Sequence, residues 1–206
     1  IRTTNTNEPI DPLPFYKDKI TDNIAPRATR IMIYGDEYRG KVSLNKPIKG
    51  ATEINGKIIV NCQLLIVNCL EAWGRISTAI SANDYMNGTT NNYGVRYVRL
   101  YVDDQLVSSS DVDRFSFDEN RLINSWTDYA EQRRSGRWYM RSAIAENNDL
   151  RMLRADTDRG WVTINEERDY HFRYELEDLY GNRSNYRFVV RGKRMDIPQH
   201  LPDYYY

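Results

Sequence analysis

The feature that most constrains the fold of this chain is a series of short segments in which apolar and polar residues alternate. This alternation runs through residues 75–82, 97–102, 170–176 and 186–190, and the second of these lies within a predicted strand 95–102. Because successive side chains of a strand point to opposite faces of a sheet, the pattern is typical of strands with one buried face. No repeating helical pattern separates these segments, so the sequence predicts an all-β fold rather than a βαβ fold.

Four other segments are also predicted to be strands, namely residues 29–34, 57–70, 138–145 and 161–164. We expect Gly35 and Asp36 to end the first of them, and residues 40–56 to form a loop or an irregular edge. Residues 146–160 are charged and interrupt the pattern. Seven or so strands at these intervals favour an immunoglobulin-like β-sandwich.

Two tight turns between alternating segments predict hairpins. Asp103 and Asp104 interrupt YVDDQLV, and both residue types tolerate the backbone of a two-residue turn. Gly181 and Asn182 separate the last two alternating segments in the same way. We therefore expect antiparallel pairing across both turns.

One segment has a helical period instead. Ser116 and Glu119 have the spacing of a capping box, in which each side chain bonds to the backbone N–H of the other residue. We predict one helical insert near residues 116–135, ending at Ser135 and Gly136. Its periodic apolar and aromatic residues are Leu122, Ile123, Trp126, Tyr129 and Ala130.

The two cysteines, Cys62 and Cys69, lie seven residues apart in KIIVNCQLLIVNCL. In one extended strand, an odd offset points the two side chains to opposite faces, and the rise of about 3.3 Å per residue separates them too far for a disulfide. We therefore predict two buried thiols that are not bonded to each other.

The charge balance excludes two classes of partner. The 206 residues include 29 Lys and Arg and 29 Asp and Glu, without any block of five like charges. The basic surface of a nucleic-acid or anionic-membrane binder is therefore not expected. No apolar run approaches the roughly 18 residues of a transmembrane helix, so no membrane span is predicted.

Motifs for catalysis and metal binding are scarce. A hydrolytic zinc site needs about three converging ligands, and only His171 and His200 are available as imidazoles. The chain has no phosphate-binding glycine loop and no nucleophile elbow. We expect no catalytic residue, no metal ligand and no cofactor in this segment.

A group of carboxylates offers an alternative to this expectation. The group could bind calcium or act as an acid–base pair, although its spacing lacks the regular oxygen ligands and the glycine of a known calcium loop. We favour a solvated sheet edge followed by a helix N-terminus, where the helix dipole stabilises acidic residues. The group consists of Asp111, Asp113, Asp118 and Glu119.

The polar loop 83–93 and the helical insert provide the candidates for a binding surface, because irregular insertions on a rigid sheet often carry binding residues. Exposed flat rings such as Tyr85, Tyr93 and Trp126 could stack on sugars, whereas burial in the core is the competing interpretation. Trp126 and Tyr129 could equally cover an open end of the sandwich. The candidate binding residues are Asn83, Asp84, Tyr85, Tyr93, Trp126 and Tyr129.

Two parts of the chain resemble the lysostaphin-like zinc endopeptidases. The last catalytic strand of that family carries His-x-His-Phe-Glu, an aliphatic residue and Arg, followed by a turn and Pro-aliphatic-Asn/Asp-Pro. The opening IRTTNTNEPIDPL fits the end of this pattern, with Glu8 where glycine often precedes the proline. The phrases AISANDYMNGTTNNYGV, LYVDDQLV, DRFSFDENRLIN and YELEDLYGN resemble the immunoglobulin-like domain that follows the peptidase in Bacteroidetes members.

The resemblance implies a cell-envelope protein, periplasmic or secreted, whose zinc-binding part lies before residue 1 and cleaves peptidoglycan cross-links with a zinc-activated water. Residues 1–26 are then the tail of that peptidase domain and a linker. Residues 27–195 are the β-sandwich, and residues 196–206 are a tail. None of the family's zinc ligands falls on this chain, so the resemblance assigns it no catalytic residue.

The expected function is that of a non-catalytic accessory module. It would position its own peptidase domain or contact peptidoglycan or another envelope protein. One alternative is a glycan-binding module that uses the aromatic residues near the loop 83–93. The other is an independent hydrolase that uses a carboxylate pair between Asp111 and Glu119.

Overall fold

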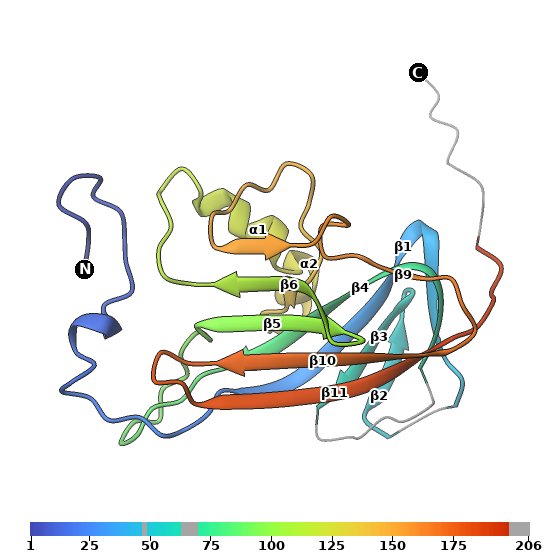
Figure 1. The fold of residues 1–206 in the computed structure, drawn as a ribbon, viewed down its shortest axis with the longest axis horizontal. Coiled ribbons are helices and arrows are strands. Elements are labelled where there is room, and N and C mark those ends of the chain that lie inside the picture. The colour runs from blue at the N-terminus through green and yellow to red at the C-terminus, as the bar shows by residue number, and fades with distance from the viewer. Residues whose placement is uncertain (47–48, 63–69, 198–206) are drawn as a thin grey trace.

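The computed structural model describes residues 1–46, 49–62 and 70–197, which form one curled, mixed β-sheet (Figure 1). The strands pair in the order β2-β3-β1-β4-β11-β10-β5-β6-β8, while β7 and β9 each pair with β4. The all-β prediction is confirmed. The strands are β1 (Arg27–Leu44), β2 (Ala51–Ile54), β3 (Lys57–Asn61), β4 (Leu70–Asn83), β5 (Tyr97–Val102), β6 (Gln105–Asp111), β7 (Met140–Arg141), β8 (Leu153–Ala155), β9 (Val162–Ile164), β10 (Asp169–Glu177) and β11 (Arg183–Gly192).

The sheet curls because its two longest strands bend. β1 and β4 pair antiparallel, and their register shifts between Gly35 and Gly40. A Cβ added to Gly40 would lie 1.7 Å from the carbonyl oxygen of Arg75, so only glycine allows the two backbones to approach this closely. Gly35 and Asp36 therefore bend β1 instead of ending it, and the prediction that the strand stops there is wrong.

The segment 40–56 is more regular than expected. β1 continues to Leu44, and β2 (Ala51–Ile54) then forms the edge strand beside β3. The expected loop is therefore limited to the residues between these two strands, while the expected edge position is correct.

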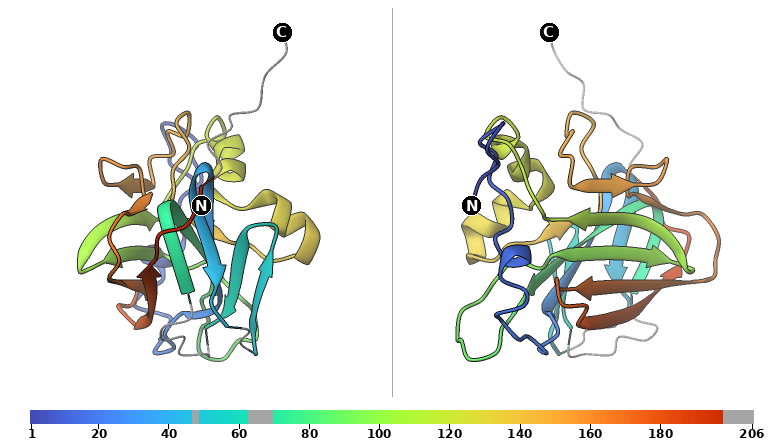
Figure 2. Two further views of the ribbon diagram at one scale, coloured as in Figure 1. Left: turned by 90° about the vertical axis from the view of Figure 1, so that its right-hand side faces the viewer. Right: turned by 60° about the vertical axis from the view of Figure 1, so that its left-hand side comes forward.

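The curl brings the two halves of the sheet face to face around the main core. Figure 2 shows β1 and β4 crossing behind β5 and β10. The Phe172 and Phe188 rings stack with centroids 5.0 Å apart, and the hydroxyl groups of Thr78 and Tyr174 lie 2.7 Å apart between β4 and β10. Apolar side chains buried almost completely in this core include Ile33, Ile58, Ile76, Ile80, Leu100, Phe172 and Leu176.

The alternating pattern places residues correctly on β5 and β10 but not on β4. Both β5 and β10 alternate between buried and more exposed side chains, as predicted. Residues 76–81 of β4 are instead buried on both faces. The reason is that Tyr139 covers the outer face of β1 and β4, where it packs with Met32, Tyr34 and Ala79.

Both predicted hairpins are confirmed. Asp103 and Asp104 have φ values of 48° and 62° and join β5 to β6, which suits a two-residue turn with a left-handed backbone. β10 and β11 pair in continuous register from Asp169 with Arg191 to Glu177 with Arg183.

The helical insert is present, but it is not one helix. It consists of η2 (Asn120–Leu122), α1 (Ile123–Trp126) and α2 (Tyr129–Ser135), and a further short turn, η1 (Leu13–Phe15), lies near the N-terminus. The predicted reciprocal bonds between Ser116 and Glu119 are formed, at 2.6 and 3.3 Å. Thr127 is extended, and Asp128 caps a new helix by accepting a bond from the Glu131 backbone N–H, so the insert is interrupted between α1 and α2.

Two segments after the insert also differ from expectation. Residues 138–145 contain only the two-residue strand β7, because Tyr139 turns inward and is completely buried. The charged segment 146–160, expected to interrupt the strand pattern, contains β8, which pairs with β6.

Cys62 is a free, half-buried thiol, and burial raises its pKa to about 12. Cys69 lies outside the described residues, as do residues 63–68 of the predicted strand 57–70 and most of the predicted tail 196–206. Within the described part of the chain, no helix is long and apolar enough to cross a membrane.

Candidate functional site

The N-terminal segment, residues 1–26, lies against one end of the curled sheet (Figure 1). Its Asp11 donates a 2.8 Å backbone hydrogen bond to Asp113, and the Asp11 carboxylate lies 3.1 Å from the guanidinium of Arg96. Further along the segment, the side-chain amide of Asn182 donates to the carbonyl oxygen of Asp22 at 3.2 Å. The segment is therefore joined to loops that follow three different strands.

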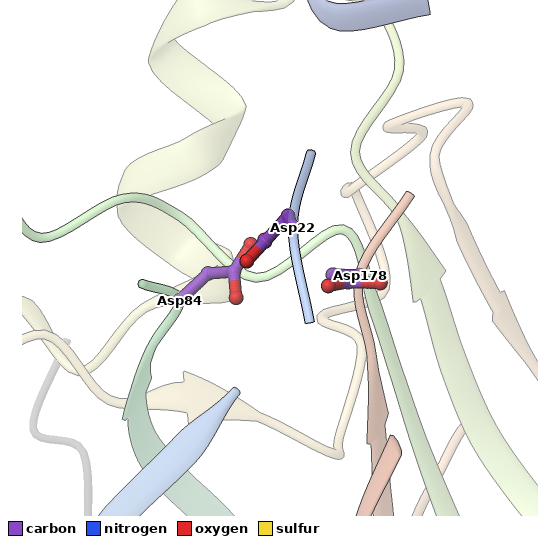
Figure 3. Close-up of side chains that lie close together, drawn as sticks. All are labelled: Asp22, Asp84 and Asp178. Atoms are coloured by element: carbon purple, nitrogen blue, oxygen red, sulfur yellow. The ribbon is translucent and has the colours of Figure 1, made fainter. Parts of the chain in front are cut away.

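Three buried aspartates meet where this segment crosses the end of the sheet. Asp22 comes from the N-terminal segment, Asp84 follows β4, and Asp178 follows β10, with exposed fractions of 8%, 6% and 1%. One carboxylate oxygen from each residue lies within 4.8 Å of the other two. Figure 3 shows the Asp22 side chain extending toward Asp84, with the Asp178 carboxylate on the opposite side.

Asp178 is fixed by the turn between β10 and β11. Its Oδ1 accepts backbone bonds of 2.8 Å from both Tyr180 and Asn182, and its Oδ2 accepts a 2.7 Å bond from the Asn182 side chain. Gly181, with φ of 90°, supplies the left-handed backbone that this turn requires. The sequence Asp-x-x-Gly-Asn therefore holds this carboxylate in place.

Asp84 is held at the start of the polar loop. Its Oδ1 accepts a 2.9 Å bond from the Tyr85 backbone N–H, and its backbone forms an isolated bridge with Tyr93 that closes the loop. Burial raises the pKa of the Asp84 carboxyl to about 7, with smaller increases from the charges of Asp178 and Asp22, while the Tyr85 N–H opposes the shift.

Asp22 has one carboxylate oxygen without a hydrogen-bond donor. Its Oδ1 accepts a 3.1 Å bond from the Ile24 backbone N–H. Its Oδ2 is buried and has no hydrogen-bond partner among the described residues. No Lys or Arg of the described chain forms an ion pair with Asp22, Asp84 or Asp178. Three acidic side chains thus share a buried space without a visible compensating charge.

A cavity of about 400 Å³ opens beside Asp84, between the N-terminal segment and the loops after β4 and β6. Most of its lining residues are apolar, and its acidic and basic lining residues are Asp11, Asp84, Arg96, Asp113 and Arg114. Tyr93, which is 36% exposed, also lines it. The apolar lining includes Ile10, Leu13, Met86, Val112 and Phe115.

The structure groups four of the six candidate binding residues. Asn83 is the last residue of β4, and Asp84, Tyr85 and Tyr93 follow it in the same loop. The Tyr85 ring is half-buried, and the guanidinium carbon of Arg27 lies 5.7 Å from its centroid. Tyr93 is the more accessible ring and the one that faces the cavity.

The other two candidates lie on the helical insert and do not line this cavity. Trp126 is buried and packs with Leu150, Met152 and Leu153. Tyr129 is 51% exposed. The two residues therefore have different environments, and the loop 83–93 and the insert do not form one aromatic platform.

The carboxylates between Asp111 and Glu119 do not converge. Asp111 pairs with Arg96 at 2.7 Å, and Asp113 pairs with Arg114 at 2.8 Å. Glu119 pairs with Arg151 at 2.9 Å, while Asp118 is exposed. His171 is exposed on β10, and His200 lies outside the described residues. No pair of acidic groups in this region is arranged around a shared space.

Sequence reasoning found Asp84 but missed Asp22 and Asp178 as its neighbours. The Asp-x-x-Gly-Asn turn at residues 178–182 was a usable signal, because such a turn fixes an aspartate at the end of a strand. The contribution of Asp22 depends on how the N-terminal segment packs, which no local pattern encodes.

The chain matches no protein-family model, no curated protein and no solved structure.

Proposed function

We propose that this chain is a non-catalytic β-domain that follows the catalytic domain of a lysostaphin-like zinc endopeptidase in the cell envelope, and that it positions that domain. The observation that supports this role is the ion pair between Asp11 and Arg96, together with the backbone bond from Asp11 to Asp113. These contacts hold the part of the chain that resembles the end of a peptidase against the β-domain.

The attachment matters because a free linker would let two domains move independently. Additional bonds distribute the attachment along the segment. Glu8 lies 2.6 Å from Arg151, and Lys17 donates to the carbonyl oxygen of Leu179 at 3.0 Å. A peptidase domain that ends near residue 12 would therefore be held in one orientation relative to the β-domain, as a positioning module requires.

We also propose that the curled sheet is a variant of the immunoglobulin-like sandwich. Bent strands that pass from one half of a sheet to the other are a known way to form the corner of a two-layered β-structure. The core packed between the halves, with Thr78 bonded to Tyr174 across it, supports this relationship.

The proposal is tested first by the codons that precede Ile1. We expect them to encode a His-x-His-Phe-Glu strand, and a preceding sequence without paired histidines would contradict the assignment. The 206-residue chain should also release no peptide from peptidoglycan when zinc is added. Release above a metal-free control would overturn its non-catalytic role.

A glycan-binding module is the second candidate, and the exposed Tyr93 ring at the rim of the cavity favours it. Co-sedimentation with insoluble peptidoglycan separates the two functions. Retention that is lost in Tyr93→Ala and kept in Tyr129→Ala would support glycan binding. The absence of retention would favour positioning of the peptidase or contact with another envelope protein.

A further inference from the structure

We propose that Asp22, Asp84 and Asp178 bind a calcium ion that fastens the N-terminal segment to the end of the β-sheet. This inference is independent of the peptidase assignment, because every residue involved lies on this chain. The three ligands come from three different parts of the structure, namely the N-terminal segment, the end of β4 and the end of β10.

The spacing of the carboxylates fits one ion. Calcium binds oxygen at about 2.4 Å, so two oxygens bound to the same ion are at most about 4.8 Å apart. One oxygen from each aspartate meets this limit with respect to both others. Figure 3 shows the Asp22 side chain extending toward the Asp84 carboxylate, and Asp22 is only 8% exposed.

The second, independent observation is the Oδ2 atom of Asp22. This oxygen is buried and has no hydrogen-bond partner among the described residues, and the residue as a whole is only 8% exposed. Buried polar atoms are nearly always bonded, and burying an ionised carboxylate without a counter-charge is costly. A bound cation would satisfy this oxygen and would compensate the negative charge of the cluster.

The surroundings contain another polar atom of the same kind. The hydroxyl group of Tyr180 is buried without a partner among the described residues. A cation or its bound water would offer this hydroxyl a partner that the described chain does not.

The donor set favours calcium over the other common ions. Zinc in proteins prefers nitrogen and sulfur ligands, and this group contains neither histidine nor cysteine. Magnesium requires near-octahedral geometry, whereas calcium accepts irregular sets of six to eight oxygens. The cavity beside Asp84 leaves room for water molecules that complete the coordination.

The binding experiment uses the 206-residue chain after treatment with EDTA. Isothermal titration at pH 7.5 should show one calcium ion per chain. Calcium at about 100 times its Kd should raise Tm by about 5 to 10 °C. Calcium should also slow trypsin cleavage within residues 1–26, because the ion joins this segment to the sheet. Absence of binding heat and of a Tm shift would overturn the proposal, as would an equal response to magnesium.

Variants assign the response to this site. Asp22→Asn keeps an acceptor for the Ile24 N–H but loses the charge, so it should abolish the Tm shift. Asp118→Asn is the matched control, since Asp118 is exposed and outside the cluster, and it should respond like the parent chain. An unchanged shift in Asp22→Asn would contradict the site.

A second measurement remains informative where a variant is poorly folded. Terbium bound near Tyr85 and Tyr180 in the parent chain should luminesce when the tyrosines are excited, and added calcium should quench this emission. Emission that calcium does not displace, or no emission above that of free terbium, would overturn the proposal.

Discussion

The side-chain amide of Asn182 donates a 3.2 Å hydrogen bond to the carbonyl oxygen of Asp22, across 160 residues of sequence. The same nitrogen donates a 2.7 Å bond to the carboxylate of Asp178. One amide group therefore joins the N-terminal segment to the turn between β10 and β11, beside the aspartate cluster.

Replacing Asn182 by Ala should loosen the N-terminal segment. The variant loses both side-chain bonds, so we expect the free energy of unfolding to fall by about 1–3 kcal/mol. Trypsin should then cleave faster after Lys17 and Lys19. Urea denaturation and limited proteolysis measure the two effects. Asn185→Ala is the control, because Asn185 is exposed on β11 and should change stability by no more than about 0.5 kcal/mol.

The buried hydroxyl pair of Thr78 and Tyr174 should stabilise the contact between β4 and β10. Thr78→Val or Tyr174→Phe each leaves one buried hydroxyl without its partner, at a cost of about 1–3 kcal/mol. The double variant should cost less than the sum of the two single variants, because the second change removes the unsatisfied group. Strict additivity in urea denaturation would show that the two hydroxyls do not act as a pair.

Gly40 should tolerate no side chain. An added Cβ would lie 1.7 Å from the carbonyl oxygen of Arg75, so Gly40→Ala must separate β1 from β4 at the bend. We expect a loss of at least about 3 kcal/mol in the free energy of unfolding, or no soluble protein. Gly94→Ala serves as the control, since no atom lies within 4 Å of its added Cβ. Equal stability of the two variants would argue against a close approach of the β1 and β4 backbones at Gly40.

Glu119 should contribute to acid sensitivity. Its bond with Arg151, helped by the backbone N–H of Ser116, lowers its pKa to about 2 from an ordinary value near 4.5. A carboxyl group whose pKa is lower in the folded state stabilises the folded chain at pH values above its pKa in the unfolded state. This stabilisation is lost as pH falls from about 4.5 toward 2. The urea midpoint of the parent chain should therefore fall over this range.

The variant Glu119→Gln should lack this part of the pH dependence. Glu146→Gln should keep it, because Glu146 is exposed and forms no side-chain bond or ion pair among the described contacts. Identical pH profiles for Glu119→Gln and the parent chain would contradict the assignment.

The sequence predicts those parts of the fold that depend on neighbouring residues. Asp103 and Asp104 form the expected turn, because the conformation of a two-residue hairpin depends mainly on the residues within it. Ser116 and Glu119 form their reciprocal bonds for the same reason, since both partners lie within one turn of chain. The alternating burial of β10 follows from its own period.

The parts that were missed depend on contacts between distant segments. In the sequence, Gly35 has the features of a residue that ends a strand. In the structure, β1 continues through Gly35 and bends, because the backbone at Gly40 lies against that of Arg75. The inward turn of Tyr139 ends the predicted strand 138–145 and buries the second face of β4. The aspartate cluster is the extreme case, because Asp22 and Asp178 are brought together by packing over more than 150 residues.

The position of β1 determines how the domain would carry mechanical load. The N-terminal segment leads directly into this strand, which lies between β3 and β4 and is bonded to both. Ladder hydrogen bonds lie across the strands, so a pull along β1 would strain many of them together instead of opening them one after another. Tension arriving through the N-terminal segment would therefore meet shear resistance at an internal strand of the sheet, not peeling at its edge.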